Sequence, residues 1–361
     1  MAIPSFVTAL WKQNKLAFFA AVYLLALILL AVLGYLIVPD QTPNANTQIA
    51  AMASKRPGHE QLFLLLPTDA SEKATWTHLF SGKPATHTLV PIHTYRLSGD
   101  NLFIHEYIHP QAGEWKSFSI HDLTGGRPET WPSLIRKKPF YLGTDGLGRD
   151  ILSRLIIGTR VSLTVGFMGM FISLIIGFLI GSMGALGGPK TDSLVQWFLG
   201  VFWSIPTILL VFAMTLAFGK GNMQIYAAIG CTLWVQIARV TRSQLMSLRE
   251  REYVQATTLM GFSNMRILFR HLLPNMTGPL LVLGTANFAS AIMIEAGLSF
   301  LGLGIQAPQP SWGLMIKEHY SYLITNKPEM ALIPGLAIVS LVLAVHLLGS
   351  AFRDRWDVRN A

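Results

Sequence analysis

Residues 251–275 read REYVQATTLMGFSNMRILFRHLLPN, a polar, helix-forming stretch between two long apolar runs. Apolar and small side chains recur at helical spacing on both sides of a central glycine. They are Tyr253, Ala256, Thr257 and Met260 before it, and Met265, Leu268, Phe269 and Leu272 after it. Gly261 can adopt the positive φ of a helix stop, Ser263 can cap the next helix, and Pro274 is expected to end it. The stretch predicts a rigid, basic elbow of two short amphipathic helices.

The composition of the chain indicates a membrane protein. Charged residues make up only 13% of the 361 residues, and the mean hydropathy is +0.44. A soluble globular chain has about 25% charged residues, so most of this chain is expected to face lipid or other apolar helices. The single cysteine, Cys231, excludes an intramolecular disulfide and a metal site made of clustered cysteines.

Six apolar segments approach the length of about 20 residues that a helix needs to cross a bilayer. They are residues 16–38, 161–186, 194–218, 225–237, 280–303 and 331–352. The fourth is short and is expected to borrow residues beyond Arg239. The first follows Lys12 and Lys15 like a secretory signal, but it is too long and lacks a small-x-small cleavage site. It is therefore expected to remain as an anchor helix.

Basic residues in the short loops predict the orientation. With the N-terminus inside, twelve fall on the cytoplasmic side: Lys12, Lys15, Lys190, Arg239, Arg242, Arg249, Arg251, Arg266, Arg270, Arg353, Arg355 and Arg359. Only Lys220, Lys317 and Lys327 fall in the short outer loops. Both termini and the elbow are therefore expected in the cytoplasm, and the net charge of +9 is mainly a topological signal that gives little support to nucleic-acid binding.

The predicted domain organisation follows these segments. Residues 1–39 hold the cytoplasmic N-terminus and the first span, and residues 40–140 form an extracytoplasmic insert. Residues 141–352 form the core of five further spans, including a cytoplasmic loop at 239–279, and residues 353–361 form a cytoplasmic tail. In the insert, segments 87–97, 101–109 and 114–122 predict strands, with a turn at 98–100. Residues 41–53 are predicted to be a linker.

The insert holds seven of the ten histidines, which raises the possibility of a metal site. His105 and His109 would share one face of a strand, with His93 across the turn. However, strand residues four apart lie about 13 Å apart, too far to share one ion without a bend. We therefore expect no metal site, and interpret these histidines as solvated or hydrogen-bonded.

Three further stretches and the elbow carry a resemblance to a known family. Residues 142–163, LGTDGLGRDILSRLIIGTRVSL, resemble the hallmark before the second span of permeases in dipeptide, oligopeptide and nickel ABC importers. Residues 295–304, EAGLSFLGLG, and 308–315, PQPSWGLM, are similar to the fifth span and following loop of that family. The elbow resembles its cytoplasmic coupling loop, with Gln255-Ala256-Thr257, Gly261, His271, Leu273 and Pro274 in the matching places. The resemblance covers residue 138 to the C-terminus, and the first span more loosely.

The chain departs from the family pattern at several positions. Gln255 and Thr257 stand where Glu and Ala are usual, so the docking chemistry would depend less on a carboxylate. His346 replaces an asparagine and Val358 a proline, and neither change carries a functional prediction. The insert is longer than in compact members of the family, so nothing known of those members is transferred to it.

The resemblance implies a permease with the six-helix type I importer fold, an all-α membrane protein carrying a small β-rich insert. It also implies a second permease subunit, two cytoplasmic ATPase subunits and an extracytoplasmic binding protein. In this interpretation Glu252, Arg266 and Arg270 make polar contacts at the rim of an ATPase groove, and Tyr253, Ala256 and Met260 fill it. The alternative is a basic amphipathic loop on anionic lipid, which would need no glycine elbow.

Two other groups of residues are candidates for a function. The motif before the second span, Gly143, Thr144, Asp145, Gly148, Arg149, Asp150 and Arg154, has acids that suggest acid–base chemistry or a cation site. A turn clamped by Asp–Arg pairs is the preferred interpretation. Glu295 is an ionisable residue inside a span, so it either lines a pathway or meets a partner subunit. Gly177, Gly181, Gly184 and Gly188 predict close helix packing.

The chain contains no Gly-x-x-x-x-Gly-Lys-Ser/Thr motif, so it is not expected to hydrolyse ATP by that route or to need a cofactor of its own. We predict a non-catalytic permease of the bacterial inner membrane that imports peptides by alternating access. Nickel complexes, oligosaccharides and other solutes are alternative cargoes. A lone ion-coupled transporter would need broken inverted repeats and several carboxylates. A membrane-anchored sensor that uses the insert is a third interpretation.

Overall fold

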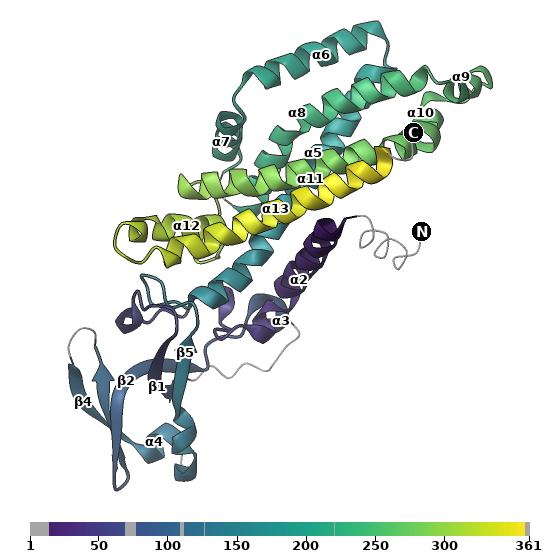
Figure 1. The fold of residues 1–361 in the computed structure, drawn as a ribbon. Helices are drawn as coiled ribbons and strands as arrows, with labels where there is room; N and C mark the ends of the chain where they lie inside the picture. The colour runs from purple at the N-terminus through teal and green to yellow at the C-terminus, as the bar shows by residue number, and fades with distance from the viewer. Residues whose placement is uncertain (1–13, 69–76, 109–111, 126, 220, 358–361) are drawn as a thin grey trace.

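The computed structural model describes residues 14–68, 77–108, 112–125, 127–219 and 221–357. It consists of a body of long helices and a small antiparallel sheet (Figure 1). The longest helices are α2 (Lys15–Ile37), α5 (Ile151–Leu186), α8 (Asn222–Arg249), α11 (Leu273–Phe300) and α13 (Glu329–Asp357). This arrangement confirms the predicted all-α membrane fold with a β-rich insert.

Four helical stretches are long and apolar enough to cross a membrane: Lys15–Ile37, Ile151–Leu186, Asn264–Phe300 and Glu329–Asp354. Helix α8 has 28 residues, about 42 Å, but its second half carries Arg239, Arg242 and Arg249, which lower its hydropathy. It does extend beyond Arg239, as the sequence predicts. The helix α5 begins ten residues before the predicted second span, at Ile151.

The third predicted span is wrong as a single straight helix. Residues 194–218 instead belong to two helices, α6 (Pro189–Ser204) and α7 (Thr207–Phe218), which meet at an angle of 94°. Pro206 lies at the break, and Ile205 before it has an extended backbone with φ −91° and ψ 127°. A proline disfavours helical geometry in the residue that precedes it, so the apolar run bends there. The four apolar stretches, this bent pair and α8 are the six segments of the described chain that correspond to the six predicted spans.

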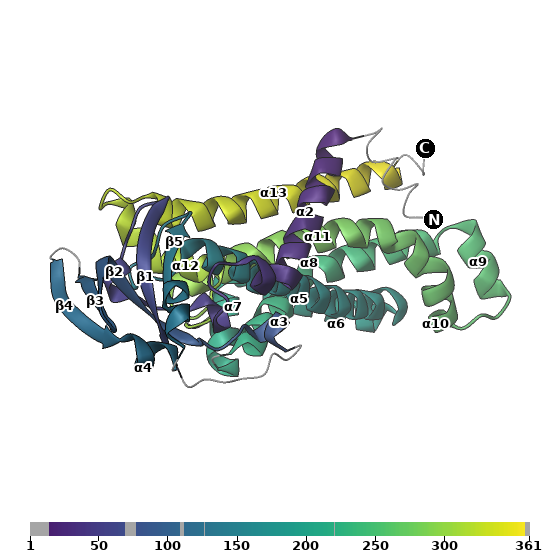
Figure 2. The ribbon, with the colours of Figure 1, turned by 90° about the horizontal axis from the view of Figure 1, so that it is seen from below.

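The two ends of the helical body differ in what they carry. The start of α2, the end of α13 and the helices α9 (Glu252–Leu259) and α10 (Asn264–Ile267) lie at one end (Figures 1 and 2). The sheet and α12 (Trp312–His319) lie at the other end, with the short turn Tyr320–Leu323 after α12. The start of α2 and the end of α13 therefore lie on the same side of the body as the elbow.

Small residues let α5 and α8 approach each other closely. A Cβ atom added to Gly181 would lie 2.5 Å from the carbonyl oxygen of Ala238, and one added to Gly177 would lie 2.6 Å from the Cβ of Ile237. Gly184 faces Val195 at 3.1 Å. Gly188 departs from the prediction: it has φ +87° with open space around it, and it forms the turn before α6.

Replacing Gly181 with alanine should therefore separate α5 from α8 and destabilise the protein by about 1–3 kcal/mol, the usual cost of overpacking. The measurement is the thermal unfolding midpoint of the detergent-purified chain. Gly200 is the matched control, because it is also helical but has no atom within 4 Å of an added Cβ. Gly200→Ala should leave the midpoint unchanged or raise it. Equal midpoints for the two variants would contradict the close packing.

The insert is a five-stranded antiparallel sheet in the order β4-β3-β2-β1-β5. Its strands are β1 (His59–Pro67), β2 (His87–Ser98), β3 (Asn101–Tyr107), β4 (Ala112–Ser119) and β5 (Ile135–Phe140). The three predicted strands correspond to β2, β3 and β4, and the predicted turn joins β2 to β3. The strands β1 and β5 were not predicted. One face packs on α4 (Ile120–Thr124) and the 3-10 helix Pro128–Leu134.

The segment predicted as a linker, residues 41–53, is packed structure. It contains two 3-10 turns, Pro43–Ala45 and Ala50–Met52, and it buries Ala45, Ile49 and Met52. Together with Phe63 and Phe140, Ile49 and Met52 form a small apolar cluster beneath the sheet. A short helix, α3 (His78–Ser81), lies on the α2 side of the insert.

Candidate functional site

The elbow is anchored to the helical body by an apolar base. Val254 of α9 and Ile267, Leu268 and Leu272 of the following segment are buried against Ala185 and Leu245, which belong to α5 and α8. The Arg249 guanidinium donates a hydrogen bond of 2.6 Å to the carbonyl oxygen of Ala185 at the end of α5. These contacts hold the elbow against two long helices, so a force on it would be carried into both.

Gly261 makes the turn between the two arms. Its φ is +78°, a conformation that favours glycine, and its N–H donates to the carbonyl oxygen of Thr258 at 3.0 Å. Ser263 occupies the predicted capping position of α10, but its side chain makes no capping hydrogen bond. The arms themselves are predicted correctly as helices.

Pro274 does not end the second arm, and that prediction is wrong. The π-helical turn Leu268–Leu272 follows α10, and α11 begins at Leu273. Pro274 therefore lies in the first turn of α11, and residues 264–300 run as one helical stretch. A proline is tolerated in a first helical turn, where backbone N–H groups lack intrahelical partners, and the wider π turn carries the chain into it.

The outer surface of the elbow is strongly apolar and exposed. The exposed fractions are 88% for Leu259, 72% for Met260, 61% for Met265, 52% for Phe269 and 44% for Tyr253. Ala256 and the rim residues Glu252, Arg266 and Arg270 are exposed as well, and His271 and Leu273 are half-buried. The sequence did not single out Leu259, Met265 and Phe269 as surface residues, because periodicity alone does not say which side of a short helix is covered.

The two positions that depart from the family pattern bond to the elbow itself. The Gln255 side-chain amide donates to the carbonyl oxygen of Glu250 at 3.2 Å, and the Thr257 hydroxyl donates to the carbonyl oxygen of Val254 at 2.7 Å.

Between the arms lies a groove of about 370 Å³ lined by residues that include Val254, Gln255 and Leu259. The arrangement can grip a protruding side chain of another protein.

The motif before α5 forms a buried ion cluster. The Asp145 carboxylate accepts hydrogen bonds from the backbone N–H groups of Leu147 and Arg149, both at 2.9 Å, and pairs with the Arg149 Nε at 2.5 Å. Glu318 of α12 accepts from Arg149 at 2.8 Å and from Arg154 at 3.1 Å. Asp145 and Arg154 are both 0% exposed. The predicted Asp–Arg pairs are thus present, and they join α5 to α12.

The same motif forms hydrogen bonds with the start of the insert, residues 49–55. The N–H of Ile49 donates to the carbonyl oxygen of Leu147, and the N–H of Ser54 donates to that of Asp145 at 2.8 Å. A Cβ on Gly148, whose φ is +76°, would collide with the carbonyl oxygen of Ile49. Thr144 exchanges hydrogen bonds with this segment, and Gly143 has a φ of +78° against Lys55. Asp150 caps α5 by accepting from the Ser153 N–H at 2.9 Å.

The only described group with metal-binding geometry lies in this cluster. Ligand atoms of Asp145, Glu318 and His319 lie within 4.8 Å of one another. Both carboxylates, however, already pair with Arg149 and Arg154, so an added cation would have to compete with two guanidinium groups. Burial lowers the pKa of the His319 imidazole, which lies 1% exposed. The donor set therefore suits ion pairing better than metal binding.

A cavity of about 470 Å³ lies beside the break between α6 and α7. Its lining includes polar side chains of α8 and α11: Thr232, Gln236, Asn287 and Ser290. The Asn287 amide donates to the Ser173 hydroxyl at 3.0 Å and to the carbonyl oxygen of Leu233 at 2.9 Å. These residues were not predicted from the sequence, although polar side chains inside apolar runs are themselves a signal of function.

Residues 173–358 match the family described as the binding-protein-dependent transport system inner membrane component. The chain belongs to this family. It is a multi-pass permease subunit of an ABC importer in the inner membrane.

Curated relatives resemble the permease over most of their length. A putative peptide permease of Brucella suis is 39% identical over 220 residues, which cover 61% of this chain and 73% of the relative. The di/tripeptide permease DppC of Pseudomonas aeruginosa is 39% identical, with 60% and 72% covered. The oligopeptide permease OppC of Bacillus subtilis is 35% identical, with 61% and 72% covered. Among solved structures, the inward-facing methionine transporter MetNI aligns with a TM-score of 0.46 at 20% identity, covering 56% of this chain and 95% of its own.

Glu295 of the permease lies in a packed contact outside the cavity. It is 1% exposed and accepts hydrogen bonds from the Ser299 hydroxyl at 2.6 Å and the Ser311 hydroxyl at 2.9 Å. Ser311 also caps α12. Glu295 thereby ties the end of α11 that lies away from the elbow to the start of α12, which favours a structural role over pathway lining.

The remaining candidate histidines form no described cluster of metal ligands. His93 and His105 stack with ring centroids 6.1 Å apart, and His105 also packs on Trp115 at 5.0 Å. His109, predicted to lie near them, falls outside the described residues, as does Val358 in the tail. His346 lies exposed in α13.

Proposed function

We propose that this permease imports peptides and forms a heterodimer with a second permease subunit. The heterodimer would act with two ATPase subunits and an extracytoplasmic binding protein. The observation that carries the proposal is the elbow: a firmly anchored helix pair whose outer surface is apolar and exposed. A subunit that must transmit an ATP-driven movement needs a stiff contact of this kind. The chain itself needs no nucleotide site in this arrangement, because the ATPase partners bind ATP.

The proposed orientation places the elbow and both termini in the cytoplasm. The excess of basic residues at that end of the helices supports it. The sheet then lies outside, where a binding protein arrives. We further propose that the cavity beside the break between α6 and α7 is this subunit's part of the substrate pathway, because uncharged amides and hydroxyls can exchange hydrogen bonds with peptide groups without holding them tightly.

Peptide cargo is supported by the names of the relatives, which include dipeptide and oligopeptide permeases. The test is uptake of a radiolabelled dipeptide by cells whose other peptide importers are deleted and in which this transporter is expressed with its partner subunits. Uptake should appear with the intact transporter and be competed by unlabelled dipeptide. Uptake of nickel without uptake of dipeptide would favour the second cargo class.

Removing the sheet should separate a permease from a sensor that works through the insert. His59 and Phe140 are paired neighbours at the root of the sheet, so residues 60–139 can be replaced by a short glycine linker. The packed segment 41–58 must stay, because the motif before α5 binds it. Dipeptide uptake should survive this deletion at a reduced level. Complete loss of uptake in a variant that still reaches the membrane and binds its ATPase subunits would favour the sensor interpretation.

A further inference from the structure

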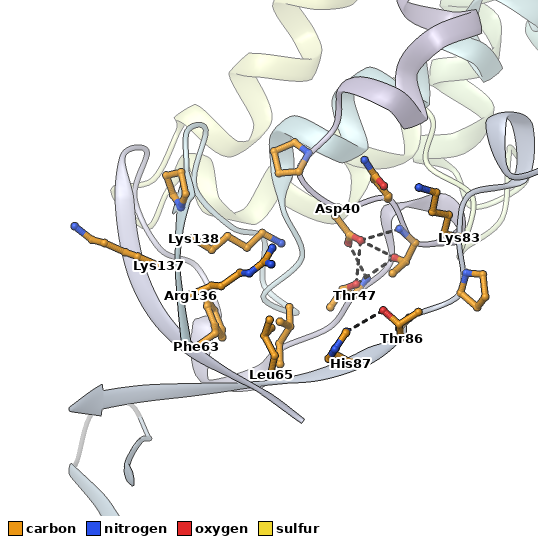
Figure 3. Close-up of a pocket in the computed structure, with 17 residues that line it drawn as sticks. Asp40, Thr47, Phe63, Leu65, Lys83, Thr86, His87, Arg136, Lys137 and Lys138 are labelled. Carbon is orange, nitrogen blue, oxygen red and sulfur yellow. Dashed lines mark hydrogen bonds between the residues drawn. The ribbon is translucent and has the colours of Figure 1, made fainter. Parts of the chain in front are cut away.

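A basic pocket lies between the C-terminal end of α2 and the sheet, away from the elbow and from the cavity beside α6 and α7. It has a volume of about 410 Å³ (Figure 3). Phe63, Leu65 and Leu89 of the sheet give it an apolar floor, and Asp40 and Thr47 line one wall. The pocket is therefore built where the first helix ends and the insert begins.

The strand β5 contributes three consecutive basic residues to the lining of this pocket. Arg136 and Lys138 lie two residues apart on one face of the strand, which places them about 7 Å apart. Lys137 also borders the pocket, but its ammonium pairs with Glu60 and its side chain points away from the pocket in Figure 3. Lys83 adds a further cation from the opposite wall, where its backbone N–H binds the carbonyl oxygen of Gln41 at 2.8 Å.

Within the described ranges, none of Arg136, Lys138 and Lys83 forms an ion pair with a carboxylate, although Lys138 interacts electrostatically with the Asp150 carboxylate before α5. Arg136 donates its Nε to the carbonyl oxygen of Ser133 at 3.4 Å, and the Lys138 ammonium lies 5.4 Å from the centre of the Phe140 ring. Among the described lining residues, the one carboxylate belongs to Asp40, which is 3% exposed. The pocket is therefore rich in cations whose guanidinium and ammonium donors are still available.

The Asp40 carboxylate is already saturated with donors. It accepts hydrogen bonds from the N–H and hydroxyl of Thr42, at 3.0 and 2.7 Å, and from the N–H and hydroxyl of Thr47, at 3.1 and 3.0 Å. A carboxylate that already accepts four hydrogen bonds has little capacity left for another cation. The charge balance of the pocket is consequently positive.

The depth of the pocket indicates which anion it meets. Helix α2 has 23 residues, about 35 Å, so it spans the hydrocarbon core of about 30 Å, and Pro39 comes after its C-cap residue Val38. Pro39 also lines the pocket. The pocket thus begins at the level of the phospholipid headgroups, where phosphate is the abundant anion.

Protection of a sheet edge is the competing explanation, since β5 is an edge strand and charged side chains discourage edge pairing. That explanation accounts for all three basic residues of β5 equally. It does not account for Lys83, which comes from a different segment and faces the same concavity. We propose that the pocket binds a phosphate group, carried by a phospholipid headgroup or free in solution, with Arg136 as the forked donor and Lys83 and Lys138 as point charges.

The test compares Arg136→Gln/Lys138→Gln with Lys137→Gln in the purified full-length transporter. Lys137→Gln is the control, because it removes one positive charge from the same strand at the residue whose ammonium pairs with Glu60 and points away from the pocket. One arm counts phospholipids retained in native mass spectrometry after exposure to vesicles of phosphatidylglycerol and phosphatidylcholine. The other arm titrates the delipidated protein with inorganic phosphate. The wild type and the control should bind about tenfold more tightly than the double variant in at least one arm.

The two arms identify the source of the phosphate. Loss of retained phospholipid alone assigns the site to a headgroup, and loss of inorganic phosphate binding alone assigns it to free phosphate. The proposal is overturned if the double variant binds both probes like the wild type, or if Lys137→Gln weakens binding as much as the double variant does. It is also overturned if only the affinity for the binding protein falls, because the pocket would then receive a protein side chain.

Discussion

Replacing Met260 with aspartate should release the ATPase subunits from the purified transporter while the permease stays folded. Met260 is 72% exposed at the tip of α9, beside Leu259, so a charge there costs the free chain little. In a docked complex the same charge would be buried in an apolar contact. Loss of a central contact of this kind typically costs at least about 2 kcal/mol, or roughly 30-fold in affinity.

The measurement is the amount of ATPase subunit that co-purifies with the tagged permease, together with ATP hydrolysis stimulated by the loaded binding protein. Ile324→Asp is the matched control, because Ile324 is 88% exposed at the opposite end of the body. This control should retain both the ATPase subunits and the hydrolysis. If Met260→Asp also retained both, the elbow would not be the ATPase contact, and a resting place on the lipid surface would become the better interpretation.

Replacing Asp145 with alanine should destabilise the half of the permease that lies away from the elbow, where α5, α12 and the start of the insert meet. The substitution leaves the buried Arg149 without its nearest carboxylate and removes the acceptor for two backbone N–H groups. Breaking a buried ion pair by removing one partner costs about 3–5 kcal/mol. We expect a lower thermal unfolding midpoint and faster proteolysis between the insert and α5.

Asp122→Ala is the control for this prediction, because the Asp122 side chain is 84% exposed in the insert. It should leave the midpoint unchanged. The double variant Asp145→Ala/Arg149→Ala should lose less stability than the two single variants added together, since the second change removes the charge that the first one stranded. Strict additivity would mean that the pair is not coupled and that the turn is held by its backbone contacts alone.

The sequence predicted the features that depend on local chemistry. Gly261 could be placed at the elbow because few residues accept its backbone angle, and Asp–Arg pairs could be predicted before α5 because two acids and two bases lie close together in residues 145–154. Pro274 was misread, because a proline looks the same whether it follows the last turn of one helix or enters the first turn of the next. The break at Pro206 carried a local signal, a proline within an apolar run, that the hydropathy pattern concealed.

Other features could not be predicted because their partners are distant in sequence. Glu318 completes the ion cluster more than 160 residues after Arg154. The strand β1, HEQLFLLLP, lacks strict alternation, and its identity depends on pairing with β2 and β5. The exposed surface of the elbow likewise depends on how α5 and α8 cover its other side.

The direct connection of the elbow to α11 has a mechanical consequence. The 28 residues of α11 make a rod about 42 Å long, with the elbow at one end and the Glu295–Ser311 contact near the other. Tilting such a rod by about 5° around the elbow would sweep its far end through about 4 Å. A small adjustment on one side of the membrane would thus arrive on the other side as a displacement as wide as a peptide backbone.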